Sequence, residues 1–288
     1  MSDAELVVLG TAQDGGLPHA GCLCRQCYAA RLDPLRRRLP ASLGVVSDSG
    51  ALLVDATLAF AEQIYRLWQA RPLKAEPGER FAPPETVVLT HAHTGHYAGL
   101  WQLDRSVMAA RGVRVLGSAA MIAFLKANEP WAMMEREGFI TLTSLPLETA
   151  VELLPGIRLT LLPVPHRSEW GVDTVALHLR GPRSCVLYLP DIDSWDAWDR
   201  DIASEAGAVD LALLDGCFWE PFHIPGVPHP PIRQSMERLA EVAGSGKTRI
   251  AFTHLNHSNP VCDPTTPEAR EVAARGFHVA QEEERFPL

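Results

Sequence analysis

The stretch Thr90-His91-Ala92-His93-Thr94-Gly95-His96-Tyr97-Ala98-Gly99-Leu100 decides the interpretation of the whole chain. It follows the apolar run 87–89, which predicts a buried strand, so its three histidines lie in the loop after the strand. Imidazole is the commonest side-chain metal ligand. Gly95 permits the sharp turn that would let the three rings converge. The stretch therefore predicts a metal site, with solvated loop histidines as the alternative.

Further candidate ligands stand at the carboxyl ends of other apolar runs. A ligand in a loop just beyond a rigid strand is held firmly and stays within reach of a substrate. Each such residue alone would be an ordinary turn or core residue, but together with the triplet they predict one site built from several strand ends. These residues are Asp55, His166, Asp191 and His254.

Three of the six cysteines are clustered as Cys22-x-Cys24-x-x-Cys27. In a reducing compartment such a cluster indicates a metal site more often than a disulfide. The segment 5–9 is strand-like and lacks the features of a secretory signal, and no apolar run is long enough to span a membrane. We therefore expect a cytoplasmic protein.

The length, composition and net charge of the chain limit the classes of binding partner that we expect. The chain has 288 residues, 47% of them hydrophobic, and a formal net charge of −9. This composition is that of a globular protein with an ample core. A negative balance argues against nucleic acid or an anionic membrane as partner. We expect a small-molecule or peptide-derived substrate, and the sequence leaves a homodimer open.

The pattern of apolar residues predicts an α/β protein of one domain, residues 1–288, made of two packed mixed β-sheets with helices outside. Periodicity near 3.6 residues predicts helices, and alternating or continuous short apolar runs predict strands. The predicted helices are 58–70, 99–110, 121–128 and 232–243. The predicted strands are 5–10, 42–47, 51–55, 86–89, 114–116, 157–163, 174–180, 184–189, 211–215 and 249–253.

This order of elements and ligands resembles the metallo-β-lactamase fold, an αββα sandwich. The resemblance implies two metals that share a bridging aspartate, which is Asp191 here. It implies that the first metal takes His91, His93 and His166. The second takes an Asp-His pair of the loop and a C-terminal histidine, and the matching positions are Gly95, His96 and His254.

Gly95 departs from that pattern because glycine offers no ligand. The first site keeps a complete set for zinc or iron. The second site is reduced to His96, His254 and Asp191, and two histidines with one carboxylate suit non-haem iron. The alternatives are a weak or empty second site, or a replacement ligand from Asn256 or His257.

Flanking motifs resemble those of the pyrroloquinoline quinone (PQQ) biosynthesis protein B family. They are Leu9-Gly-Thr-Ala-Gln-Asp-Gly-Gly16 with the cysteine cluster, Leu214-Asp-Gly-Cys-Phe-Trp219, Gly226-Val-Pro-His-Pro230 and Thr253-His-Leu-Asn-His-Ser-Asn-Pro260. In related cyclic-phosphate phosphodiesterases, three such cysteines and a distant histidine hold a structural zinc. The resemblance thus implies a zinc at Cys22, Cys24 and Cys27, for which we expect His229 as fourth ligand and His223 as second choice.

Three hypotheses of function follow from the resemblance. The first is an oxidoreductase or hydroxylase that acts on a tyrosine-derived intermediate of PQQ biosynthesis, with zinc or iron at its site and with Asp191, His96 and His254 in catalysis. The second is a metal-dependent hydrolase of a phosphodiester, ester or lactone. The third is a non-catalytic carrier of PQQ or an intermediate. The loss of a ligand at Gly95 favours the first.

Overall fold

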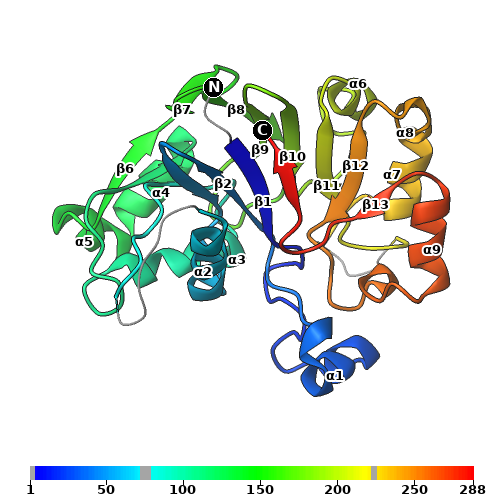
Figure 1. The fold of residues 1–288 in the computed structure, drawn as a ribbon, viewed down its shortest axis with the longest axis horizontal. Coiled ribbons are helices and arrows are strands. Elements are labelled where there is room, and N and C mark those ends of the chain that lie inside the picture. Colours follow the sequence, from blue (N-terminus) through cyan, green and yellow to red (C-terminus); the bar gives the residue numbers. More distant parts are fainter. Residues whose placement is uncertain (1–3, 72–78, 222–225) are drawn as a thin grey trace.

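Two seven-stranded β-sheets pack face to face in a computed structural model that describes residues 4–71, 79–221 and 226–288 (Figure 1). The predicted fold class is confirmed. The first sheet has the order β14-β1-β2-β3-β4-β5-β6. Its strands are β1 (Ala4–Gly10), β2 (Ser42–Ser47), β3 (Gly50–Val54), β4 (Thr86–Val88), β5 (Val113–Gly117), β6 (Ile140–Ser144) and β14 (Arg285–Pro287).

The second sheet has the order β13-β12-β11-β10-β9-β8-β7. Its strands are β7 (Val151–Leu154), β8 (Ile157–Val164), β9 (Thr174–Arg180), β10 (Cys185–Leu189), β11 (Leu211–Asp215), β12 (Arg249–Thr253) and β13 (His278–Val279). All ten predicted strands are present, with ends that differ by at most one residue, and β6, β7, β13 and β14 are strands that the pattern did not predict.

Strand direction places the predicted ligands together. In the first sheet β1, β3, β4 and β5 point the same way, because β1 and β3 are both antiparallel to β2, and β3, β4 and β5 pair in parallel. In the second sheet β8, β10, β11 and β12 likewise share one direction. The loops that leave these strands therefore meet at common sheet edges, and open α/β sheets bind ligands at such carboxyl ends.

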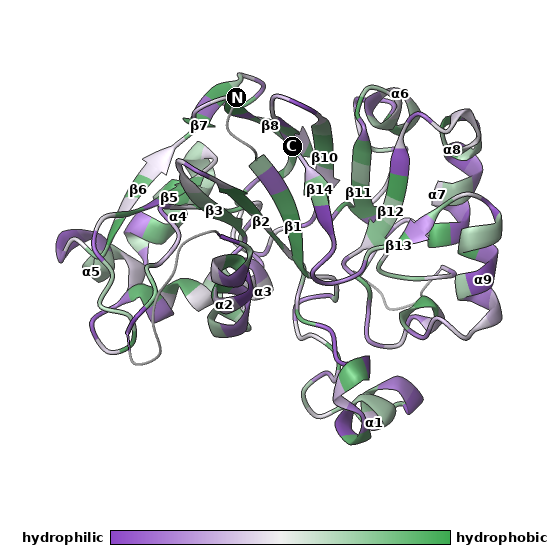
Figure 2. Cartoon of the chain, viewed as in Figure 1, coloured by the Kyte–Doolittle hydropathy of each residue, from purple (hydrophilic) through white to green (hydrophobic). Residues whose placement is uncertain are grey.

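The sheets join through alternate side chains of their strands. In β1, Leu6 and Val8 point into the core between the sheets, and Val7 and Leu9 point to the outer face. In β11, Leu213 faces inward and Leu214 outward in the same way. Because both faces are covered, these strands are almost continuously apolar, as Figure 2 shows for the central strands.

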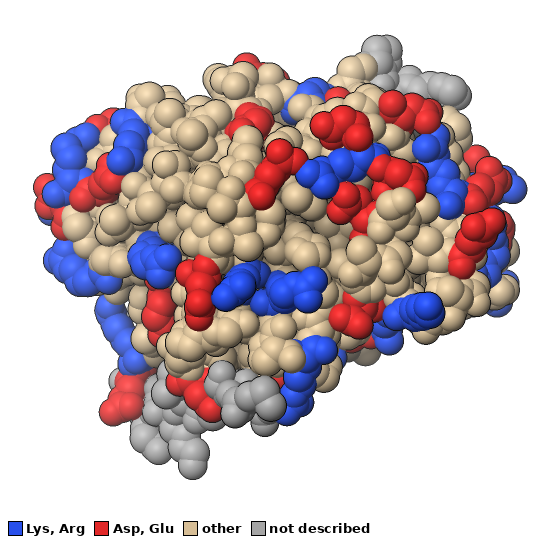
Figure 3. Space-filling model, turned by 90° about the horizontal axis from the view of Figure 1, so that it is seen from above, with Lys and Arg blue, Asp and Glu red and all other residues tan. Residues whose placement is uncertain are grey.

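Helices cover both outer faces. On the first sheet lie α2 (Phe60–Ala70), α4 (Ala119–Ala127) and α5 (Trp131–Arg136), and α3 (Thr94–Tyr97) carries His96. On the second sheet lie α6 (Ile202–Gly207), α7 (Ile232–Arg238), α8 (Ala240–Ser245) and α9 (Pro267–Ala274). No helix in the described ranges is long and apolar enough to cross a membrane. Basic and acidic side chains are intermixed over the face in Figure 3.

One segment stands apart from the sandwich. Residues 17–38, here called the cysteine projection, extend away from the sheets and contain α1 (Arg25–Leu32) and the short 3₁₀ helix Pro34–Arg36 (Figure 1). Its base is closed by two backbone hydrogen bonds of 2.9 Å between Leu17 and Arg38. The cysteine motif therefore lies on an extension of the fold.

Two predicted helices were wrong in extent. The segment 99–110 forms only a 3₁₀ helix, Ala98–Leu103, because Asp104 leaves the helical conformation and its carboxylate accepts a hydrogen bond from the Ser106 N–H. The segment 232–243 is divided into α7 and α8 at Leu239. Helices 58–70 and 121–128 are confirmed as α2 and α4, and the predicted helices did not include α1, α5, α6 and α9.

Gly99 has no room for a side chain, because a Cβ there would lie 2.0 Å from the Thr57 carbonyl oxygen. We predict that Gly99→Ala lowers the free energy of unfolding by about 1–3 kcal/mol. Gly244→Ala in α8 is the control, since a Cβ there has no neighbour within 4 Å and should stabilise the helix slightly. Urea unfolding of both variants checks this, and equal stabilities would contradict the close approach.

Candidate metal centre

The histidine loop begins directly after β4 and enters the short helix α3. His91 and His96 are almost fully buried, and His93 is partly exposed. Their rings point to the same edge of the sandwich, with centroids of His91 and His96 4.1 Å apart. The predicted convergence of the three histidines is therefore what the structure shows.

Group one consists of His91, His93, His166 and Asp191. His91 Nε2 lies 3.0 Å from His93 Nδ1, which lies 3.2 Å from His166 Nε2. The two oxygens of Asp191 close the group, with Oδ2 3.3 Å from His91 Nε2 and Oδ1 3.3 Å from His166 Nε2. Four potential ligand atoms thus surround one point.

Group two consists of Asp14, His96, Asp191 and His254. His96 Nε2 lies 3.3 Å from His254 Nε2. Asp14 Oδ1 lies 3.2 Å from the first of these nitrogens and 3.4 Å from the second. Asp191 Oδ2 is 3.4 Å from His254 Nε2. Asp191 therefore belongs to both groups.

The spacing of these atoms fits metal ions. Four ligands placed tetrahedrally at about 2.0 Å from a zinc ion are about 3.3 Å from one another. The hydrogen bonds of the rings agree with this. His96 Nδ1 lies 2.8 Å from Asp55 Oδ2, so its Nε2 faces the Asp14 carboxylate at 3.2 Å. Burial opposes protonation of His96, but Asp55 and Asp14 raise its pKa well above the usual value, so a metal ion bound here would take the place of the Nε2 proton.

Asp55 is a hydrogen-bond partner of the ligand histidines and is not itself a ligand. Besides His96, its carboxylate accepts hydrogen bonds from the Thr90 N–H and hydroxyl, and Thr90 Oγ1 lies 2.9 Å from His91 Nδ1. It therefore fixes the ring orientation of one histidine in each group. Carboxylate partners of this kind orient ligand histidines and raise their basicity.

The other two rings of group one have carboxylate neighbours too. Asp193 Oδ1 lies 2.8 Å from His166 Nδ1, and Glu169 Oε2 lies 3.2 Å from His93 Nε2. Glu169 is exposed and comes from the loop after β8. A hydroxyl or carboxylate oxygen thus lies next to the far nitrogen of each imidazole of group one.

The charges in the centre are consistent with cation binding. Burial opposes ionisation of Asp191, but His254 and His166 hold its pKa well below the usual range. Burial is likewise outweighed at Asp14, where hydrogen bonds from His254 and His96 keep the pKa low. Burial and the nearby His96 lower the pKa of His91, which leaves it neutral. Ionised carboxylates and neutral imidazole are the forms that bind metals.

A buried pair of residues adjoins Asp191. His229 Nδ1 lies 2.7 Å from Asp215 Oδ2 and 3.5 Å from Asp191 Oδ1. The other oxygen of Asp215 accepts the Cys217 N–H, so this carboxylate is already hydrogen-bonded on both sides. Burial opposes protonation of His229, but Asp215 raises its pKa to about 9. The ring is therefore protonated at neutral pH.

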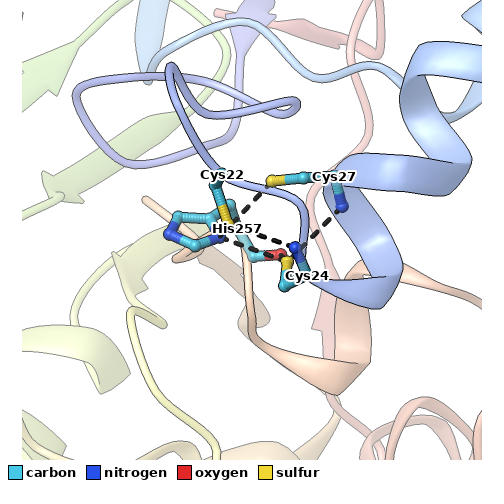
Figure 4. A group of neighbouring side chains, drawn as sticks. All are labelled: Cys22, Cys24, Cys27 and His257. Carbon is cyan, nitrogen blue, oxygen red and sulfur yellow. Dashed lines mark hydrogen bonds between the residues drawn. The ribbon is translucent and has the colours of Figure 1, made fainter.

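The three clustered cysteines meet a histidine of the β12–α9 connection. Their sulfurs lie 3.7 Å (Cys22), 3.5 Å (Cys24) and 3.5 Å (Cys27) from His257 Nδ1, and all four side chains point toward one centre in Figure 4. Three sulfurs about 2.3 Å and a nitrogen about 2.0 Å from zinc would show sulfur–nitrogen separations of about 3.5 Å. The cluster has the composition and spacing of a closed structural zinc site.

Comparison with known proteins decides the family. Residues 51–255 match the model of the beta-lactamase superfamily domain. The chain is 30% identical to coenzyme PQQ synthesis protein B of Methylobacterium radiotolerans, over 96% of this chain and 98% of that protein. The chain belongs to the coenzyme PQQ synthesis protein B family of the beta-lactamase superfamily. The protein of the same name from Ruegeria pomeroyi is 26% identical over 96% of this chain and 98% of its own length.

Solved structures agree on the fold of this family member. Zn²⁺-bound PqqB from Methylobacterium extorquens superimposes with a TM-score of 0.82 at 24% identity, and the match covers 99% of this chain and 100% of that chain. A diphosphatase from the PhnP family gives a TM-score of 0.69 at 22% identity, covering 99% and 97%. These likenesses support the αββα arrangement of the sheets.

The ligands that the resemblance implied are brought together, but Asp55, a candidate ligand at a strand end, belongs to neither group and instead binds His96. The expected fourth ligand of the cysteines and both alternative replacement ligands for group two were also wrong. His229 is paired with Asp215 and is not the histidine at the cysteines, which is His257. His257 is thereby unavailable to group two, and Asn256 donates to the Gln13 side chain instead. His223 lies outside the described residues.

Asp14 was missed as a candidate ligand. It follows β1, and the strand-end rule that selected Asp55 would also have selected it. Its carboxylate occupies the space beside Gly95: a Cβ on this glycine would lie 2.5 Å from Asp14 Cβ and 2.6 Å from its Cα. A carboxylate from the β1 loop therefore replaces the one that the family pattern places in the histidine loop, and Gly95 makes room for it.

We predict that Asp14→Gly weakens binding of one active-site metal equivalent by more than about 100-fold, since it removes a ligand and not merely a supporting partner. Gly95→Asp alone should also impair binding, because the two side chains would overlap. The double variant Asp14→Gly/Gly95→Asp should not regain the lost affinity, because a Cβ at position 95 would still lie 2.6 Å from the Cα of residue 14. Metal analysis and competition with a chelator measure this, and wild-type affinity in Asp14→Gly would show that Asp14 is not a ligand.

Proposed function

We propose that this protein is a metal-dependent hydrolase with a dinuclear centre. The observation that carries the proposal is that two complete groups of four ligand atoms share the carboxylate of Asp191. Redox chemistry was favoured because Gly95 leaves group two without a carboxylate ligand from the histidine loop. The Asp14 carboxylate lies beside His96 and His254 in the structure, so this reason for redox chemistry is removed.

Two metal ions, one in group one and one in group two, would lower the pKa of a bound water. They would also neutralise charge on the attacked and the leaving oxygens of the substrate. Phosphodiesters, esters and lactones are the substrate classes that this chemistry suits. The chain contributes the positions of the ions through buried ligands that are held by Asp55, Thr90 and Asp193. Such a preorganised shell keeps ligand geometry within narrow limits.

The chain also offers a proton donor. His229 is buried beside Asp191, its Nδ1 is bound by Asp215, and its Nε2 finds no hydrogen-bond partner among the described residues. With a pKa of about 9 the ring carries a proton at neutral pH that it can donate to a leaving oxygen, while Asp215 stabilises the imidazolium. We therefore assign His229 as general acid.

A second candidate is oxidation or hydroxylation of a tyrosine-derived intermediate in PQQ synthesis, with iron at the centre. It is favoured by the 30% identity to a coenzyme PQQ synthesis protein B over nearly the whole chain. The geometry favours it less, because the facial pattern of two histidines and one carboxylate is here joined by Asp14. A non-catalytic carrier of PQQ is the third candidate.

The test compares ester hydrolysis with oxygen consumption in the same purified protein, loaded with different metals. We expect zinc- or manganese-loaded protein to hydrolyse bis(p-nitrophenyl) phosphate or a lactone panel, and His93→Ala to abolish turnover. The control Asn128→Ala changes an exposed residue. If iron-loaded protein instead consumes oxygen with a tyrosine-containing peptide and no ester is cleaved with any metal, the oxidoreductase is correct.

The assignment of His229 predicts a dependence on the leaving group. His229→Gln should lower kcat about 100-fold or more for alkyl esters, whose leaving oxygen needs a proton, and only a few-fold for p-nitrophenyl esters. Because the protonated form is active, the wild-type rate with alkyl esters should fall as pH rises through about 9. Equal losses for both ester types would assign His229 a structural role.

A further inference from the structure

The two metal-binding features of the chain are joined through short segments. Asp14 of group two lies eight positions before Cys22, and His254 of group two lies three positions before His257. Both pairs link the active-site group to the cysteine cluster. The two connecting segments also bind one another.

The first link is a backbone and side-chain ladder. The Gln13 N–H donates to the Leu255 carbonyl at 2.8 Å, and the Leu255 N–H donates to the Thr11 carbonyl at 2.8 Å. The Asn256 amide donates to Gln13 Oε1 at 2.6 Å. The residue before Asp14 is therefore bound to the two residues between His254 and His257.

The second link passes through His19 on the other side of Asp14. Its N–H donates to Cys27 Sγ at 3.2 Å, and its ring lies 4.6 Å from the ring of His257. The same ring covers Gly15, where a Cβ would lie 2.4 Å from His19 Nδ1. Asp14 is thus flanked by Gln13, which is hydrogen-bonded to Leu255 and Asn256, and by Gly15. This glycine packs under the His19 ring, which lies next to His257 of the cluster.

The projection has other attachments to the sandwich. Leu17, Cys27 and Ala30 belong to the same buried cluster as Leu255, and Arg38 donates to Thr11 Oγ1 at 3.0 Å. Beside these contacts lies a cavity of about 1200 Å³, lined by residues of both parts. The Gln26 side chain donates to the Asn259 carbonyl, and Arg36 pairs with Asp263 at 3.0 Å. The cysteine–His257 cluster differs from these contacts in that it joins the chain that follows Asp14 to the chain that follows His254.

Group one is anchored elsewhere. His91 and His93 come from the loop after β4 and His166 from the loop after β8, and their far nitrogens face Thr90, Glu169 and Asp193. These residues belong to the sandwich. A change in the projection should therefore alter the metal affinity of group two more than that of group one.

We propose that a metal ion in the Cys22–Cys24–Cys27–His257 cluster acts as a brace that positions Asp14 and His254, so that the affinity of group two for its metal depends on the cluster, whereas that of group one does not. The proposal rests on the dinuclear centre proposed above. It makes His19 a positioning residue, and it gives the projection a role in assembling the active site.

The experiment measures metal binding of the purified protein without any activity assay. Cys27→Ser removes a cluster ligand, and Cys185→Ser is the matched control in β10, outside the projection. His19→Ala keeps all four cluster ligands but removes the ring over Gly15, and the control is His278→Ala in β13. Zinc is titrated against a chelator, and the titration is repeated in a His93→Ala background, where group one is impaired. The zinc that the cluster holds is counted separately, from the stoichiometry lost in Cys27→Ser.

We expect both test variants to weaken group two by about 10- to 100-fold, the effect typical of lost supporting partners, and to change group one less than about twofold. Unchanged affinity of group two in His19→Ala, or equal weakening of both groups, overturns the brace. If Cys27→Ser does not fold, His19→Ala decides. A wild-type protein that holds one ion in the active centre would refute the dinuclear function itself, which is a distinguishable result.

Discussion

The buried carboxylate of Asp191 is the point on which the centre depends. Its side chain is 2% exposed, and each of its oxygens faces imidazole nitrogens of one or both groups. An ionised carboxylate without compensation is costly to bury. Bound cations would compensate the charge of Asp191. The histidines at the strand ends, and the carboxylates that orient them, would hold these cations in place.

The sequence predicted most of this arrangement because its signals are local. Apolar runs and the residues that end them place His166, Asp191 and His254 at one sheet edge, and Gly95 permits the turn that lets the three rings of the histidine loop converge. The partner of the cysteines was not predictable in this way, since Cys27 and His257 are 230 positions apart and the loop that brings them together follows from packing. Asp104 shows a similar limit, because its side-chain hydrogen bond ends a helix that periodicity extends.

The exchange between Gly95 and Asp14 shows why a family pattern has to be assessed in space. A metal requires an oxygen at a certain point, and either of two neighbouring loops can supply it. The missing aspartate of the histidine loop suggested an incomplete site. The glycine is instead the feature that admits the replacement ligand, since any side chain at position 95 would collide with Asp14.

The two sheets contribute to the centre from opposite sides. Asp14, His91, His93 and His96 follow strands of the first sheet, whereas His166, Asp191 and His254 follow strands of the second. Neither half alone presents a full ligand set, so ions bound here would fasten the halves across their seam. Ligands that bind only the assembled protein add RT ln(1 + [L]/Kd) to its stability, about 4 kcal/mol at a thousandfold excess over Kd. Metal supply would then govern the mechanical cohesion of the sandwich as well as its chemistry.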